Sequence, residues 1–185
     1  MAAVMGAEEE LVKNICNNVK GFVKPANYNT IGQIVISGEE ESVLEAAEIL
    51  KESGAKKVTI LNTAGPFHTE KLDKASQAFK AELEKINIKS KNSNVVKNID
   101  GKLYSENDDI KEILANHIKN PVKFTTVLQT MYDSGIDTFI EIGPGKTLSG
   151  FVKRMKFEKP INILNINSVK TLENVLTELS RKEND

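Results

Sequence analysis

Apolar and polar residues alternate along the first third of the chain in blocks that predict two strand–helix–strand units. Short apolar runs bounded by glycine are typical of strands, and apolar residues spaced three and four apart mark one face of a helix. The predicted elements are a strand at 2–5, a helix at 7–20, strands at 22–28 and 33–37, a helix around 43–50 and a strand at 58–61. The order βαββαβ is typical of a ferredoxin-like subdomain.

After Gly65-Pro66 the pattern changes to longer helices followed by strand–helix alternation. Strands that alternate with helices indicate an α/β layer. We predict a helix at 72–86, a helix at 110–118, a helix that begins at Pro121 and runs to 134, a buried strand at 138–142, a helix to 155, a strand at 161–166 and a helix at 172–179. The last residues, 181–185, are predicted to be frayed.

Composition narrows the class of protein. The 185 residues are 39% hydrophobic and 28% charged, with a net charge of −1, which suits a soluble globular protein and disfavours a nucleic-acid binder. Cys16 is the single cysteine, so no disulfide can form within the chain, and its spacing with Leu11, Ile15 and Val19 predicts a buried apolar residue. No apolar run is long enough to cross a bilayer, and residues 1–6 lack a signal-peptide pattern. We therefore expect a cytoplasmic protein.

His68 is the leading candidate for chemistry. It lies in the segment Thr63-Ala64-Gly65-Pro66-Phe67-His68-Thr69, between a predicted strand and a long amphipathic helix. Thr69 is a plausible N-cap of that helix, and the positive end of the helix dipole would favour a neutral imidazole that can act as a base. The alternative is a loop histidine that packs by chance against Phe67.

His117, the second histidine, lies at the C-terminal end of a predicted helix, where a solvated histidine or one that compensates the helix dipole is the ordinary interpretation. The two histidines are far apart in sequence and lack the spacing of metal ligands, so we expect no metal site. The segment Gly143-Pro144-Gly145-Lys146-Thr147 looks like the tail of a phosphate-binding loop. Because its first glycine would fall at Ile140, a structural turn is the better interpretation.

The sequence also contains a basic cluster and lacks the motif of a nucleophilic serine. The cluster is a solvated helix face or a docking patch for an acidic partner, and it comprises Lys146, Lys153, Arg154, Lys156 and Lys159. A nucleophile elbow needs a serine flanked by two glycines in the order G-x-S-x-G. Neither Ser37 nor Ser149 has both glycines, so the sequence offers a base without a recognisable nucleophile.

Several segments together resemble the malonyl-CoA:acyl carrier protein transacylase family. They are residues 1–6 and 27–38, Gly65-Pro66-Phe67-His68, residues 116–124 (NHIKNPVKF) and residues 141–148 (EIGPGKTL). The match runs nearly end to end in the family's order, although similar motifs also occur in acyltransferase domains of polyketide and fatty-acid synthases. The resemblance implies an α/β fold in which residues 1–62 form a ferredoxin-like small subdomain and residues 63–185 the C-terminal part of an α/β-hydrolase-like acyltransferase core.

The resemblance also implies a mechanism. A serine attacks the malonyl thioester, CoA leaves, and the pantetheine thiol of acyl carrier protein takes the malonyl group in a ping-pong reaction of fatty acid biosynthesis. His68 matches the family's catalytic histidine, and His117 stands where the family usually has a glutamine whose backbone carbonyl orients that imidazole. Phe67 matches a position associated with malonyl preference, and Asn29 falls in a motif near the pocket.

The implied partners are acyl carrier protein, which carries phosphopantetheine, and malonyl-CoA as substrate. No bound cofactor, metal, nucleic acid or membrane is expected. A carrier-protein docking patch would comprise Lys146, Lys153, Arg154 and Lys156.

The family's serine and carboxylate-binding arginine lie upstream of the matched region, and neither Arg154 nor Arg181 takes the arginine's place. We therefore expect a fragment that supplies the histidine but not the serine and is inactive alone. The alternative is an acyltransferase domain, or a non-catalytic carrier-protein-docking module, of a polyketide synthase system.

Overall fold

The computed structural model describes residues 1–89 and 93–182 of the 185-residue chain. These residues form two compact units, Met1–Thr130 and Met131–Asp185, whose boundary falls inside a helix. The first unit contains β1 (Ala2–Met5), α1 (Glu9–Asn18), β2 (Val23–Thr30), β3 (Gln33–Gly38), α2 (Glu40–Glu52), β4 (Lys57–Ile60), the short 3-10 turn η1 (Glu70–Leu72), α3 (Asp73–Glu84), α4 (Ile110–Lys119) and most of α5 (Phe124–Asp133).

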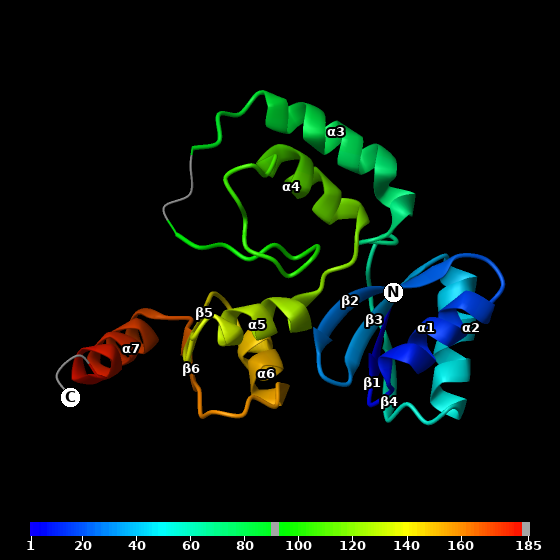
Figure 1. The fold of residues 1–185 in the computed structure, drawn as a ribbon. Helices are drawn as coiled ribbons and strands as arrows, with labels where there is room; N and C mark the ends of the chain where they lie inside the picture. Colours follow the sequence, from blue (N-terminus) through cyan, green and yellow to red (C-terminus); the bar gives the residue numbers. More distant parts are fainter. Residues whose placement is uncertain (90–92, 183–185) are drawn as a thin grey trace. The chain divides into compact units, whose positions relative to one another are not determined.

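The first unit is built on a four-stranded sheet in the order β2-β3-β1-β4. All its strand pairs are antiparallel, with β1 in the centre between β3 and β4. Helices α1 and α2 lie side by side on one face of this sheet (Figure 1). Between them and the sheet lies an apolar core that includes Val4, Val12, Ile36 and Leu50. The βαββαβ order predicted from the hydrophobic pattern is present in the structure.

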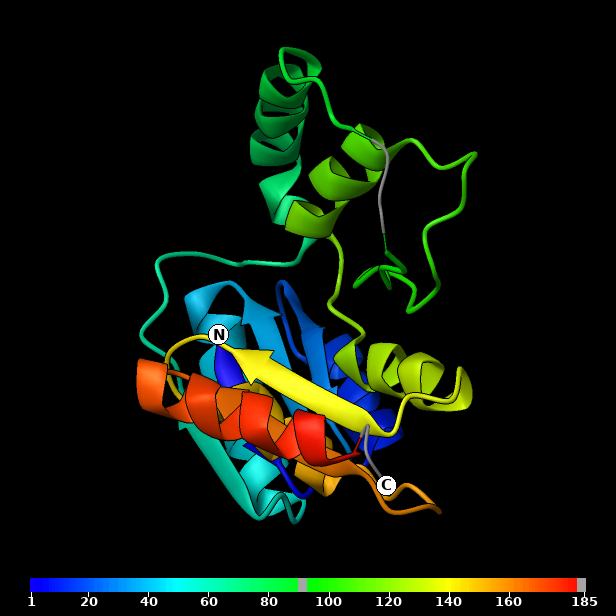
Figure 2. The ribbon, with the colours of Figure 1, turned by 90° about the vertical axis from the view of Figure 1, so that its left-hand side faces the viewer.

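Helices α3 and α4 of the first unit run alongside each other (Figure 2). The buried Ser76 hydroxyl on α3 donates to the carbonyl of Ala115 on α4, 2.7 Å away. Lys80 pairs with Glu112 further along the same two helices. Asp109 caps the N-terminus of α4 by accepting a hydrogen bond from the Glu112 N–H. The α3–α4 pair is thus tied together by polar contacts along its length.

The segment after α4 corrects one prediction from the sequence. We expected Pro121 to open the next helix, but α5 begins at Phe124. Val122 is instead extended and bridges to β2: its N–H donates to the Ala26 carbonyl, and its carbonyl accepts from the Tyr28 N–H. These two long-range bonds hold residues 121–123 against the sheet, so the proline ends one helix without starting another.

The second unit contains a two-stranded parallel sheet of β5 (Thr138–Ile142) and β6 (Asn162–Ile166). Helix α6 (Thr147–Arg154) contacts both strands, and α7 (Val169–Lys182) contacts β6. The rings of Phe139 and Tyr132 both stack on Phe157. The strand predicted at 138–142 is present. Its burial is incomplete, however, because Ile142 is 77% exposed.

The other predicted elements are present with shifts of a few residues at their ends. Among the residues expected to fray, 181 and 182 still belong to α7, and 183–185 lie outside the described residues. The predicted division of the chain at residue 62 stays a prediction. Cys16 is buried as predicted, and this burial raises the pKa of its thiol to about 11.

Leu50 tests whether the first core is as well packed as its burial indicates. Leu50 is fully buried under the sheet, whereas Leu44 on the same helix is 44% exposed. We expect Leu50→Ala to lower the unfolding free energy of the first unit by about 2–5 kcal/mol, because it removes apolar contact and leaves a cavity. Leu44→Ala, the matched control, should change it by about 0.5 kcal/mol or less. Native-state hydrogen exchange of the β1 and β3 amides measures both, and equal losses would contradict this packing.

Candidate active site

His68 stands on a tightly held loop between β4 and α3. Its φ angle is 60°. In the described part of the chain, His68 is the one non-glycine residue with a positive φ. This left-handed backbone costs about 1–2 kcal/mol for an ordinary residue, so its surroundings must hold it in place. The His68 N–H donates to the carbonyl of Ile118, 3.2 Å away, and the Phe67 N–H donates to the Gly65 carbonyl.

Thr69 stabilises the same loop, but not in the predicted way. It was expected to cap a helix by accepting a hydrogen bond from a backbone N–H. Its hydroxyl instead donates to the Pro66 carbonyl at 2.6 Å, and the side chain makes no capping bond to η1. Thr69 is 1% exposed, so this bond closes the loop from the inside. The helix α3 itself begins only at Asp73, after the 3-10 turn.

The imidazole of His68 makes a hydrogen bond that determines its tautomer. Its Nδ1 lies 2.9 Å from the backbone carbonyl oxygen of His117. A carbonyl can only accept, so Nδ1 must carry the proton. In the neutral ring the proton is then absent from Nε2, whose lone pair is available. The arrangement can therefore accept a proton at Nε2 from a group that approaches from outside.

His68 also lines a cavity of about 460 Å³. Its other lining residues are Lys24, Pro25, Glu70, Asp73, Lys119, Asn120 and Pro121. The charged residues are paired: Lys24 with Glu70, and Lys119 with Asp73 at 2.5 Å. The hydrogen bond from Lys119 holds the pKa of the Asp73 carboxyl below its usual range, so Asp73 stays ionised at neutral pH. The half-buried His68 thus borders a cavity that charged side chains help to line, and it does not lie in an apolar interior.

The ring of His117 lies in a different environment from the solvated one that we considered. Its Nε2 is buried and has no hydrogen-bond partner. Burial, and secondarily the nearby charge of His68, lower its pKa from the ordinary value of 6.5. The ring is therefore neutral at physiological pH and does not compensate the helix dipole. The hydrogen bond to the other histidine is made by the backbone carbonyl of His117 and not by its ring.

The remaining candidate residues are divided between the two units. Phe67 is 43% exposed, and Asn29 is half-buried on β2; neither belongs to the lining of that cavity. In the second unit, Lys146 precedes α6, Lys153 and Arg154 end it, and Lys156 follows it, all exposed. These four residues are called the α6 basic cluster below.

The glycine-rich segment 143–147 is a turn between β5 and α6, as the sequence indicated. Gly143 and Gly145 take positive φ angles of 145° and 86°. The first N–H groups of α6 are occupied by the Glu141 carboxylate, which accepts from Leu148 and Ser149 at 3.1 and 2.7 Å. A carboxylate from the preceding strand therefore takes the position that a phosphate would need.

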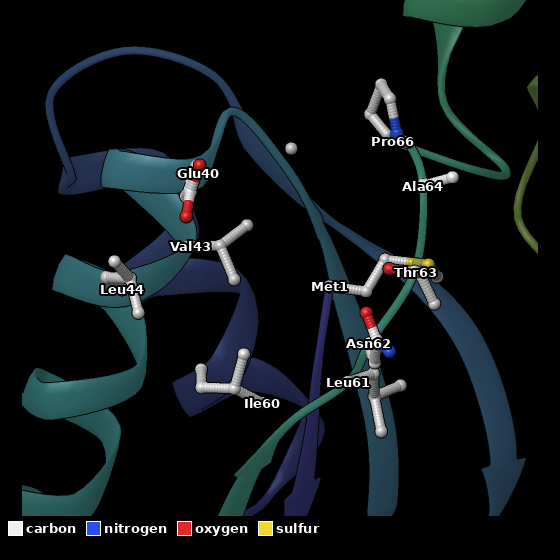
Figure 3. A pocket seen from close by; sticks show the side chains of 12 residues that line it. Met1, Glu40, Val43, Leu44, Ile60, Leu61, Asn62, Thr63, Ala64 and Pro66 are labelled. Atoms are coloured by element: carbon white, nitrogen blue, oxygen red, sulfur yellow. The ribbon is translucent and has the colours of Figure 1, made fainter.

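A second cavity, of about 580 Å³, lies between α2 and the segment 60–66 that leads to His68 (Figure 3). Val43 and Leu44 on α2 line it together with Ile60 and Leu61. Its one ionisable side chain is Glu40, and no histidine lines it. The cavity beside His68 is the better candidate for an active site.

Within residues 1–89 and 93–182, no three His, Cys, Asp or Glu side chains lie close enough together to bind a metal ion. Over that same part of the chain, every helix is too short or too polar to span a bilayer.

Sequence reasoning missed the polar residues around His68. Asp73 and Lys119 are 46 positions apart, as are Lys24 and Glu70, and no local pattern links the members of either pair. The motif around residues 116–124 was the one signal available, since it includes Lys119 and Pro121 along with His117.

Comparison with known proteins identifies the relatives of the chain. The family described as "Acyl transferase domain" matches residues 1–173. Malonyl CoA-acyl carrier protein transacylase of Bacillus subtilis is 37% identical over the whole chain, which spans 58% of that protein's length. The crystal structure of malonyl CoA-acyl carrier protein transacylase from Clostridium perfringens is 42% identical with a TM-score of 0.92, covering 98% of this chain and 57% of that one.

A third relative is solved with a partner. It is a malonyl-transacylase in complex with its type II PKS acyl-carrier protein; it is 29% identical with a TM-score of 0.90, covering 96% of this chain and 57% of that one. The chain thus spans a little over half the length of the relatives that it matches.

The buried ring of His117 predicts a pH-dependent stability. Its pKa is lowered in the folded state, so the folded form binds fewer protons than the unfolded form around pH 6. The unfolding free energy should therefore be highest above pH 6.5 and fall as the pH is lowered through the depressed pKa. Urea unfolding at several pH values between 5 and 8 measures this slope. His117→Gln should reduce the dependence of the unfolding free energy on pH, whereas His68→Gln should leave most of that dependence in place. If the slope is unchanged in His117→Gln, another group is responsible for it.

Proposed function

Because this chain belongs to the acyl transferase domain family, we propose that it provides the catalytic histidine of a malonyl-CoA:acyl carrier protein transacylase. The whole enzyme would transfer a malonyl group from malonyl-CoA to the pantetheine thiol of acyl carrier protein in fatty acid biosynthesis. The observation that carries this proposal is the hydrogen bond from His68 Nδ1 to the His117 carbonyl. The names of the Bacillus subtilis and Clostridium perfringens relatives support the choice of substrate.

The proposed architecture follows the same relatives. The sheet β2-β3-β1-β4 with α1 and α2 has the strand order and connections of a ferredoxin-like fold, which supports a small subdomain at 1–62. Residues 63–185 would belong to an α/β-hydrolase-like core. The parallel pair β5-β6 supports this assignment, because parallel strands normally belong to larger sheets covered on both faces.

Two proton transfers at His68 Nε2 make up the first half of the reaction. Nε2 takes the proton of a serine hydroxyl as its oxygen attacks the malonyl thioester carbonyl. The same nitrogen then returns this proton to the sulfur of CoA as the carbon–sulfur bond breaks, leaving a malonyl ester on the serine. We propose that this serine lies outside the 185 residues, since no serine of the chain has the flanking glycines of a nucleophile elbow.

In the second half of the reaction, the malonyl group passes from the serine to the pantetheine thiol. Nε2 takes the proton of the pantetheine thiol, whose sulfur attacks the malonyl ester, and returns it to the serine oxygen as the ester bond breaks. Protons therefore balance over the cycle, and His68 ends as it began. No cofactor is needed beyond the phosphopantetheine carried by the partner protein.

The role proposed for His117 belongs to its backbone. A carbonyl that accepts from Nδ1 fixes the ring orientation and stabilises the imidazolium formed when Nε2 is protonated. Any residue with the same backbone position supplies this carbonyl, so the histidine side chain is not required for the reaction.

Further residues are proposed to contact the acyl group and the carrier protein. Phe67, adjacent to the catalytic ring, would limit the acyl group by its bulk and favour malonyl over branched units. Asn29 would line the substrate pocket of the whole enzyme. The α6 basic cluster would attract the acidic carrier protein. The type II PKS complex among the relatives supports a carrier-protein partner and keeps a polyketide pathway as the alternative.

A reconstitution experiment tests the proposed base. We expect the chain alone to form no malonyl-enzyme with malonyl-CoA. Combined with the part of the Clostridium perfringens protein that it does not cover, it should transfer malonyl to holo acyl carrier protein. His68→Ala should then lower kcat by about 10²–10⁴, the usual contribution of a general acid–base group. Lys74→Ala, an exposed control on α3, should not change kcat. Equal turnover by the His68→Ala and parent complexes would refute the role of His68.

Carrier-protein docking has a separate test. Reversing the charge at Lys153 and Arg154 should weaken the binding of an acidic carrier protein by about tenfold or more at low salt, because their charges attract it over a distance comparable with the Debye length. Calorimetry at 20 and 300 mM salt measures this loss, which should shrink at high salt. Lys170→Glu, an exposed lysine of α7 outside the cluster, is the matched control. Binding that does not respond to salt or to the double reversal would place the docking site elsewhere.

A further inference from the structure

The carbonyl groups at the end of α4 are the feature of the His68 site that neither the family match nor the mechanism explains. The last carbonyls of a helix have no N–H partner within the helix and must be satisfied from elsewhere. Near the end of α4, the Ala115 carbonyl accepts from the Ser76 hydroxyl and the Asn116 carbonyl accepts from the Asn120 side chain. The next two carbonyls, of His117 and Ile118, both accept from His68, through Nδ1 and the backbone N–H.

The sequence and the Val122 bridge explain why these two carbonyls have no N–H partner within the helix. In a continuing helix, His117 would accept from the N–H of residue 121, and Ile118 from that of residue 122. Residue 121 is proline and has no N–H. Residue 122 has one, but it donates to the Ala26 carbonyl on β2, 2.9 Å away. The carbonyls of His117 and Ile118, in the last turn of α4, are therefore free to hold the loop that carries His68.

The backbone before the proline agrees with this interpretation. Asn120 is extended, with φ −120° and ψ 153°, the conformation that a following proline favours. The chain then runs directly into the Val122 bridge with β2. On the other side, His68 holds a left-handed φ of 60° that needs anchors. Its two bonds to α4 are those anchors.

We propose that Pro121 is a positioning residue for His68, because its missing N–H keeps the His117 carbonyl available to His68 Nδ1. Pro121 also lines the cavity beside His68. The inference rests on the proposed function for its catalytic meaning. The geometry that it explains belongs to this chain alone, so it can be tested without acyl transfer.

The test compares two variants of the full chain that differ only in an N–H group. Pro121→Ala restores the N–H, whereas lactic acid incorporated at position 121 by nonsense suppression gives the same methyl side chain with an ester in place of the amide. The readout is the histidine-ring ¹⁵N NMR spectrum above pH 7.5, which distinguishes the Nδ1–H from the Nε2–H tautomer. Since the chain has two histidines, His117→Gln in the same backgrounds assigns the His68 signals.

We expect the ester variant to keep His68 mainly as the Nδ1–H tautomer. In Pro121→Ala the new N–H competes for the His117 carbonyl, so the ring should move toward the Nε2–H tautomer that free histidine prefers. Pro160→Ala, in the loop before β6, should leave the His68 spectrum unchanged. A merely structural proline would affect the alanine and ester variants alike, so a difference between them is specific to the missing N–H.

Four other outcomes decide between a role for the missing N–H and a role for the proline ring. If both variants keep the Nδ1–H tautomer, or both lose it, the missing N–H is not what positions His68, and the proposal is overturned. If the alanine variant fails to fold while the ester variant folds, the N–H alone causes the loss, which supports the proposal. If both fail to fold, the proline ring is what the site requires, and the proposal is again overturned. Failure of malonyl transfer in the reconstituted enzyme would leave each of these results unchanged.

Discussion

The hydrogen bond between His68 Nδ1 and the His117 carbonyl is the interaction on which the site depends. It joins a loop that follows the four-stranded sheet to the end of a helix 49 residues later in the sequence. It sets the tautomer of the ring and leaves Nε2 free. A carbonyl acceptor differs from a carboxylate because it cannot take the proton, so it orients the imidazole and leaves the proton on Nδ1.

Contacts elsewhere in the first unit fix the two segments that this hydrogen bond joins. Helix α4 is fixed to α3 by the buried Ser76 hydroxyl and by the Lys80–Glu112 and Lys119–Asp73 pairs. The exposed pairs contribute little stability individually, so the buried hydroxyl is the firmer connection. After α4, the bridge between Val122 and β2 connects the helix end to the sheet. The sheet and the α3–α4 pair are thus both connected to the loop that carries His68.

Much of the fold could be predicted from the sequence because local periodicity determines it. The βαββαβ order, the helices α3, α4, α6 and α7, and the strands β5 and β6 all follow from runs and spacings within 20 residues. The start of α5 could not be predicted. Local preference allows Pro121 at the first turn of a helix, but pairing of Val122 with Asn27, 95 positions away, keeps that segment extended. Long-range pairing of this kind leaves no local pattern in a single sequence.

In the candidate site, too, some features follow from local sequence patterns and others depend on long-range packing. The motif around residue 68 predicts His68 as a candidate base, and the family resemblance predicts that the backbone carbonyl of residue 117 accepts from its ring, as it does in the structure. The burial of the His117 ring, the left-handed backbone of His68 and the Thr69–Pro66 bond depend on packing, so sequence patterns gave no indication of them. The fully paired charges around the cavity were missed for the same reason, because their partners come from different elements.

The tautomer of His68 in the unaltered chain shows directly whether the bond to the His117 carbonyl forms. Ring ¹⁵N NMR at a pH where both histidines are neutral reports which nitrogen carries the proton. We expect a protonated Nδ1 and a bare Nε2 on His68. A ring protonated mainly at Nε2 would mean that the bond to His117 does not form in solution and that His68 is not prepared to act as a base.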